Sequence, residues 1–105
     1  MDILFKTTKL QKQCNELKRA QRTWGTRRGE LVMRRLDELR AAECLEDLRN
    51  LTGARCHELH GRRAGELSVD LEYPYRLVFR PAHDPVPKKP DGGLDWARVR
   101  AVVIL

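Results

Sequence analysis

Two histidines and four arginines lie close together in one stretch of the sequence, Cys56–Ala82. Histidine can give or accept a proton near neutral pH, because its unperturbed pKa is about 6.5. Arginine carries a permanent charge and a fork of N–H donors that matches the oxygens of a phosphate. Residues of these two types, brought together by the fold, could hold a phosphate and move a proton beside it.

Arg76 is the arginine of this stretch that a strand would hold most rigidly. Residues 75–79 are rich in β-forming types and predict a strand whose side chains alternate between two faces. One face would carry Tyr75, Leu77 and Phe79, and the other Arg76, Val78 and Arg80. Arg76 would then emerge from the middle of a sheet, which suits bidentate phosphate contact. A solvated or ion-paired strand arginine would leave the same pattern.

Two turns frame this strand and its neighbour. Gly61–Gly65 predicts a glycine-bounded hairpin turn, after which Leu67, Val69 and Leu71 alternate with polar residues as in a half-buried strand. The sequence Glu-Tyr-Pro-Tyr at 72–75 predicts a second turn, because proline fixes its own φ and restricts the residue before it. An antiparallel meander is the simplest arrangement.

The flanking segments predict helices before the meander and a strand at each end. Residues 2–7 and 99–105 are apolar and β-prone, so we expect a strand at each end of the chain. A first helix is expected from Thr7 or Thr8 to Trp24, with core positions Leu10, Cys14 and Leu17. A second helix is expected over residues 26–42 and a short third one over 43–50. Residues 83–93 predict a long loop without regular pairing. The fold class is therefore α+β, an N-terminal helical hairpin packed on a small, mostly antiparallel sheet.

The charge of the chain is concentrated in its first part. The formal net charge is +6, and residues 1–65 hold 15 Lys or Arg against 9 Asp or Glu, whereas residues 66–105 hold six of each. A polyanion such as RNA or DNA is the natural partner, although basic helix faces are also common as solvated surface. Lys88 and Lys89, at the tip of the long loop, could touch phosphate or serve solubility alone.

Length and composition indicate a single domain over residues 1–105, located in the cytoplasm. The sequence has neither an apolar run of membrane-spanning length nor the start of a signal peptide. Its three cysteines form no close pair, so no disulfide is expected. Cys56, His57 and His60 lack a fourth ligand for structural zinc, so we expect no metal and no cofactor.

The run HELHGRRAGELSVDLEYPYRLVF, together with the later GGLDWARVRAVVIL, resembles the HigB-like, or plasmid-maintenance killer, branch of the RelE/ParE toxin superfamily. The likeness covers nearly the whole chain. It implies the microbial RNase fold and a toxin of a type II toxin–antitoxin pair that cleaves mRNA in the ribosomal A site without a metal. It also implies a HigA-like antitoxin with a helix-turn-helix domain, no membrane partner, and contact with operator DNA only through the toxin–antitoxin complex.

The resemblance gives roles to particular residues. Arg76 stands at the family's strand arginine and would hold the phosphate, and His57 matches the histidine that opens the HEL segment and would do the acid–base work. A strand histidine bonded to the backbone would also fit His57, and His60, on the opposite strand face, is less suited. Arg62 and Arg63 would steer the RNA backbone. The other expected RNA or ribosome contacts are Lys18, Arg19, Arg22, Arg27, Arg28, Lys88 and Lys89.

Two alternatives stay open at this point. Family members normally continue past the last strand into a short tail that contributes to the active site, so a chain ending at Leu105 looks truncated and could be an inactive protein that only binds antitoxin or RNA. A ParE-like toxin shares the fold but binds DNA gyrase and needs no acid–base residue. Substitution of Arg76 and His57 should separate nuclease from gyrase inhibitor.

Overall fold

A five-stranded mixed sheet forms the centre of the protein in a computed structural model that describes residues 1–105. The strand order is β1-β5-β4-β3-β2, with β1 parallel to β5 and all other neighbours antiparallel. The strands are β1 (Asp2–Phe5), β2 (His57–Glu58), β3 (Leu67–Asp70), β4 (Arg76–Pro81) and β5 (Ala101–Ile104). The predicted α+β class and the mostly antiparallel sheet are confirmed.

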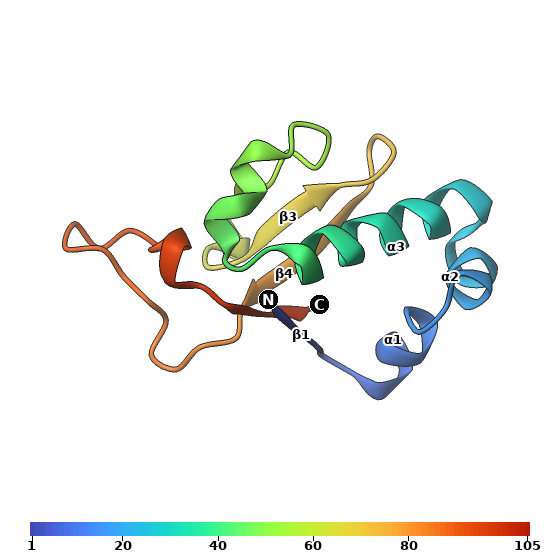
Figure 1. Ribbon diagram of the computed structural model, residues 1–105, viewed down its shortest axis with the longest axis horizontal. Helices are drawn as coiled ribbons and strands as arrows, with labels where there is room; N and C mark the ends of the chain where they lie inside the picture. The colour runs from blue at the N-terminus through green and yellow to red at the C-terminus, as the bar shows by residue number, and fades with distance from the viewer.

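Three α-helices precede the sheet's later strands in the chain. They are α1 (Thr8–Gln13), α2 (Leu17–Trp24) and α3 (Thr26–Ala41), and three short 3₁₀ helices follow as η1 (Leu45–Asn50), η2 (Gly61–Arg63) and η3 (Trp96–Arg98). Figure 1 shows α3 lying across one face of the sheet, with α1 and α2 below its N-terminal half. None of the helices combines the length and apolar character that a membrane crossing requires.

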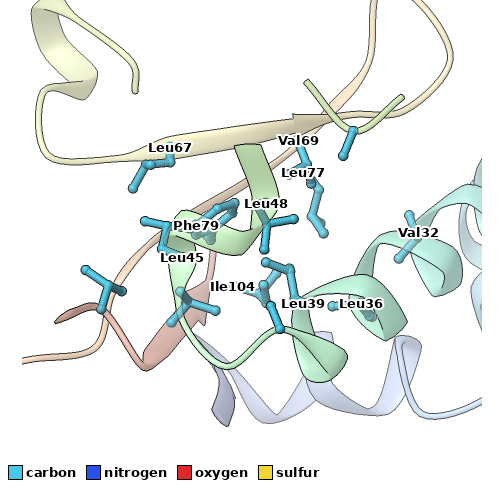
Figure 2. Packing of buried hydrophobic residues seen from close by; sticks show 14 of the residues in the cluster. Val32, Leu36, Leu39, Leu45, Leu48, Leu67, Val69, Leu77, Phe79 and Ile104 are labelled. Carbon is cyan, nitrogen blue, oxygen red and sulfur yellow. The ribbon is translucent and has the colours of Figure 1, made fainter. Parts of the chain in front are cut away.

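One face of the sheet and one side of α3 bury the core between them (Figure 2). Leu36 and Leu39 of α3 meet Phe79 of β4 and Ile104 of β5, and all four side chains have no exposed surface. The apolar residues recur at helical spacing in α3 and alternate in the strands, as each geometry requires for one buried face. The sheet residues that alternate with them lie on the other face.

Arg35 of α3 is a charged residue within this packing and is only 8% exposed. Its guanidinium donates to the backbone oxygens of Asp70 (2.7 Å) and Gly53 (2.9 Å), and to a carboxylate oxygen of Glu38 (2.8 Å). A buried guanidinium is tolerated when its donors are satisfied in this way. The fork fixes the middle of α3 against the end of β3.

The predicted first helix is wrong in extent, because it is divided into α1 and α2. Thr7 caps α1 as expected, its hydroxyl accepting from the Leu10 N–H at 3.1 Å. Cys14 then ends α1, and Glu16 has an extended backbone (φ −150°, ψ 158°) that no helix continues through. The change of direction leaves Leu17 45% exposed instead of in the core, while Cys14 is buried as predicted.

The helical hairpin is formed by α2 and α3, which pack closely through a glycine. A Cβ on Gly29 would lie 2.5 Å from the backbone nitrogen of Gln21, so only glycine permits this approach. Gly25, with φ 91°, ends α2 and precedes α3 in the left-handed region that glycine adopts readily. The predicted break at residues 24–26 and the second helix are confirmed.

The predicted short third helix is present as the 3₁₀ helix η1, whereas three details of the later chain differ from expectation. Ser68 is fully buried, so β3 is not half-buried, and Lys88 pairs with Leu94, which places a small bridge in the long loop. Tyr75 belongs to the turn before β4 and is 47% exposed, because the strand begins only at Arg76. The turn itself is present, with the Tyr75 N–H donating to the Glu72 carbonyl at 2.7 Å.

Truncation of two leucines in the helical segment should change the free energy of unfolding by very different amounts. Leu39→Ala removes a fully buried side chain and should lower the free energy of unfolding by about 3 kcal/mol. Leu17→Ala, at a residue that periodicity places in the core but the structure exposes, should change it by less than about 0.5 kcal/mol. Urea unfolding followed by circular dichroism compares the two; an equal loss in both variants would contradict the division of the first helix.

Candidate functional site

Arg76 is the first residue of β4, and its side chain has no hydrogen bond or ion pair within the chain. Its register partner on β3, Asp70, is bound instead by Arg55, with 2.8 Å between the guanidinium Nε and the carboxylate. Arg76 therefore lies on the central strand of the sheet, as predicted, but at the end of that strand and not within it. Its charge is uncompensated, which excludes the ion-paired alternative and leaves a guanidinium free for a phosphate.

His57 lies on the same face of the sheet as Arg76. It pairs with Ser68 of β3, which pairs in turn with Val78 of β4, and Val78 follows Arg76 by two residues on that face. His57 and Arg76 line one hollow of about 590 Å³ together with Glu58, Leu59, His60, Arg63 and Val78. The fold thus brings together the two residues that the sequence predicts for proton transfer and phosphate binding.

The tautomer of His57 is determined by its backbone contact. Its Nδ1 lies 2.9 Å from the carbonyl oxygen of Arg55. A carbonyl oxygen only accepts, so Nδ1 carries the proton of the neutral ring and Nε2 keeps a free lone pair. The sequence left open that His57 is only a strand histidine bonded to the backbone. The hydrogen bond to the Arg55 carbonyl is present, and it leaves the second ring nitrogen of His57 able to accept a proton.

His60 does not lie where strand alternation would put it. β2 ends at Glu58, and the chain turns into η2, so His60 lines the same hollow as His57 instead of pointing to the opposite face. Arg62 and Arg63 are exposed in η2, as the predicted turn suggested. Arg63 is bound to Glu66 at 2.8 Å and also lines the hollow, whereas Arg62 has no partner.

Ser68 lies beneath this group of residues. It is fully buried between His57 and Val78 in the register of the sheet, and its hydroxyl oxygen has no hydrogen-bond partner. Unsatisfied buried hydroxyls are uncommon in folded proteins. Sequence alternation alone marked it only as a solvent-facing residue of a half-buried strand.

A second, strongly basic hollow of about 680 Å³ opens between α1 and α2. Its lining contains no acidic and no hydrophobic residue and consists of Thr8, Lys9, Lys12, Gln13, Arg19, Arg22 and Thr23. Lys18 and Arg22 also line a smaller hollow on the other side of α2. Arg19 is the one lining cation with an acidic neighbour, Glu16 at 3.8 Å, and that pair is exposed to solvent. Cations collected in a concave surface attract polyanions.

Arg28 is the clearest correction among the predicted RNA contacts. Its guanidinium bonds to Glu72 and stacks on Tyr75, 3.4 Å from the ring centroid. The bond to Glu72 raises the pKa of Arg28 above its ordinary value. Arg28 therefore connects α3 to the β3–β4 turn and is not a free surface cation, whereas its neighbour Arg27 is exposed and unpaired.

Lys88 and Lys89 lie far from the other predicted contacts. The loop that carries them extends to one end of the molecule's longest axis, and α1 and α2 lie at the other end (Figure 1). Lys89 is within 4.0 Å of Asp91, and the Lys88 carbonyl accepts from Arg98. These two lysines do not belong to the site around Arg76.

Arg76 is shared by three separate hollows. It lines the His57 hollow, a hollow next to the β3–β4 turn, and a third one of about 640 Å³ that reaches Trp24 and Leu105. Gln13 lines both this third hollow and the basic hollow of α1 and α2. The basic hollow and the His57 hollow therefore each have a lining residue in common with the third hollow.

Two of the three thiols, those of Cys14 and Cys56, offer no alternative nucleophile. Burial raises the pKa of Cys56 to about 12 and that of Cys14 to about 11, so both stay protonated near neutral pH. No group of three or more metal-ligating side chains comes together in the structure. Cys56 packs against the core, away from any ligand set with its neighbours His57 and His60.

Sequence reasoning missed the part that Arg55 plays beside Arg76 and the burial of Ser68. Arg55 has a positive φ of 44° and satisfies Asp70, which Arg76 would otherwise neutralise. Only the register of β3 and β4, which places Asp70 opposite Arg76, could have indicated that a competing cation was needed.

In comparisons with known proteins, no family model, no curated protein and no solved structure matches the chain.

The reactivity of the thiols tests the burial of Cys14 and Cys56. At pH 8 about a thousandth of Cys14 and a ten-thousandth of Cys56 should be thiolate, so iodoacetamide should modify half-buried Cys44 first. Modification of Cys14 and Cys56 should accelerate roughly tenfold per pH unit up to pH 10, because only the thiolate reacts. Mass spectrometry of the native chain and of Cys44→Ser measures this; three equally fast native thiols would contradict it.

Proposed function

We propose that this chain is a ribosome-dependent mRNA endoribonuclease, the toxin of a type II toxin–antitoxin pair of the HigB-like branch. The observation that carries the proposal is an unpaired guanidinium, Arg76, in one hollow with His57, whose Nε2 is free to accept a proton. The order of one strand, three α-helices and four further strands in a single sheet, with α3 on one sheet face, is consistent with the RelE-like fold that the sequence resemblance implies.

The proposed reaction needs no group beyond the chain and the RNA. His57 Nε2 accepts the proton of a ribose 2′-hydroxyl, and the oxygen attacks the adjacent phosphorus as the bond to the 5′-oxygen of the next nucleotide breaks. Arg76 stabilises the negative charge that develops on the phosphate oxygens. The products are a 2′,3′-cyclic phosphate and a 5′-hydroxyl end.

The leaving 5′-oxygen requires a proton, and the His57 hollow contains one further histidine. His60 lines this hollow just before η2, where it is exposed to solvent and can take up a proton from water. A protonated His60 would donate to the leaving oxygen while His57 acts as base. Arg63, already oriented by Glu66, would contact the RNA backbone beside it.

Docking on the ribosome is the role that we propose for the basic hollow of α1 and α2. Lys9, Lys12, Arg19 and Arg22 present a concave positive surface at the end of the molecule away from the 83–93 loop. The positive charge there would attract the phosphates of ribosomal RNA, and the docked protein would hold the mRNA at Arg76. Correct positioning of the reacting groups can by itself supply much of the rate of cleavage. The toxin would act in the cytoplasm and be neutralised by a HigA-like helix-turn-helix antitoxin that also carries it to operator DNA.

Arg76→Ala should abolish cleavage, whereas Arg80→Ala should not. Both arginines are exposed on the same face of β4, but Arg80 lines none of the hollows described above. Loss of a single positioned donor to the phosphate should slow cleavage by about 100-fold or more. Primer extension on mRNA in programmed ribosomes, with each purified variant, would show the new 5′ ends of the downstream fragments.

The same assay separates the nuclease from a ParE-like gyrase inhibitor. An intact message with the unaltered chain, combined with growth arrest that persists in Arg76→Ala, would contradict the nuclease. Inhibition of gyrase supercoiling by both forms would then identify the second class of toxin.

Charge reversal in the α1–α2 hollow should weaken ribosome binding. Arg22→Glu changes the local charge by two units next to Lys12 and Arg19, so affinity at physiological salt should fall at least about tenfold. Lys89→Glu makes the same change at the far end of the molecule and is the matched control. Co-sedimentation with ribosomes measures both; equal losses would argue for non-specific charge attraction instead of a docking surface.

A further inference from the structure

The turn between β3 and β4 exposes two aromatic rings to solvent. Tyr73 is 97% exposed at the tip, and Tyr75 is 47% exposed at its end. They are the only aromatic residues among the large hydrophobic side chains that the surface exposes. Exposed tyrosines that are held in place are characteristic of binding surfaces, since they offer a large, stiff contact area.

The turn is held rigidly in this position. The Tyr75 N–H donates to the Glu72 carbonyl at 2.7 Å, and the Leu71 N–H donates to the Tyr75 carbonyl at 3.0 Å. Arg28 covers one face of the Tyr75 ring at 3.4 Å while bonded to Glu72. A ring fixed in advance loses little conformational freedom when a ligand stacks on it.

Tyr75 also lines a hollow of about 290 Å³ with Tyr73, Pro74 and Arg76. The other lining residues are Leu71, Arg55 and Asp70, and the last two neutralise one another, with 2.8 Å between them. Arg28 and Glu72 form a second neutral pair behind the ring. Arg76 is then the one uncompensated charge beside the two tyrosines, so the surface suits a ligand that joins a flat ring to an anion.

We propose that Tyr73 and Tyr75 form a stacking platform for a nucleobase of single-stranded RNA whose phosphate is bound by Arg76. Aromatic rings flanked by arginine are a common solution for unpaired bases, because every base has a π-face. The inference rests on the proposed function for RNA as the substrate class, but it does not require cleavage. A base fixed next to Arg76 would set which phosphate reaches His57.

Binding of short oligomers tests the platform without the ribosome. Fluorescein-labelled octauridylate and an abasic ribose-phosphate oligomer of equal length are titrated with the full chain, and anisotropy is recorded at low salt. The chain should bind octauridylate more tightly than the abasic oligomer. Tyr73→Leu should weaken octauridylate binding about tenfold and leave abasic binding unchanged, since stacking contributes about that much per base. Tyr73→Phe keeps the ring and should stay within about twofold.

Three results would overturn the platform. These are equal affinity of the unaltered chain for the two oligomers, unchanged octauridylate binding by Tyr73→Leu, and a loss in Tyr73→Leu that is equal for both oligomers. None of them touches the nuclease proposal, which depends on Arg76→Ala in the ribosome assay. Conversely, base-dependent binding by a chain that leaves ribosomal mRNA intact would support the platform and contradict the nuclease.

Discussion

The buried guanidinium of Arg35 is the interaction on which the arrangement of helices, sheet and site depends. It joins the middle of α3 to the backbone of Asp70 and Gly53, and so fixes where β3 ends. Asp70 continues the connection, because its N–H donates to Ala54 and its carboxylate binds Arg55. Removal of Arg35 would leave buried carbonyl oxygens without a donor and would lower the free energy of unfolding. The buried guanidinium in the core therefore helps to fix the register of the strands that carry the site.

The arginines of this chain divide into those that hold the fold and those that are free. Arg28, Arg35 and Arg55 each bind a carboxylate or a backbone oxygen of a residue distant in sequence. Arg76 has no such partner, although it faces Asp70 directly across the sheet. An arginine that stays unpaired opposite an aspartate requires another cation to occupy that aspartate, and Arg55 does so.

The α+β class, the helical hairpin and the meander could be predicted from the sequence, because periodicity and turn residues report which face is buried. The joint placement of His57 and Arg76 was expected from the family resemblance alone, because no periodic pattern links the two residues. The break at Cys14–Glu16 could not be predicted, since spacing alone allowed Leu17 into the core. Side-chain partners were equally hidden. Arg27 and Arg28 are adjacent and chemically identical, and only the folded position of Glu72 decides which of them is engaged.

That short break between α1 and α2 also affects the energy of the fold. A single straight helix would spread Lys9, Lys12, Arg19 and Arg22 over a convex surface, whereas the bend gathers them around one concave space. Like charges at close range oppose the compact state, and a bound polyanion removes the opposition. The native protein thus retains electrostatic repulsion in its helical end, and binding of phosphate there would favour both the complex and the folded chain.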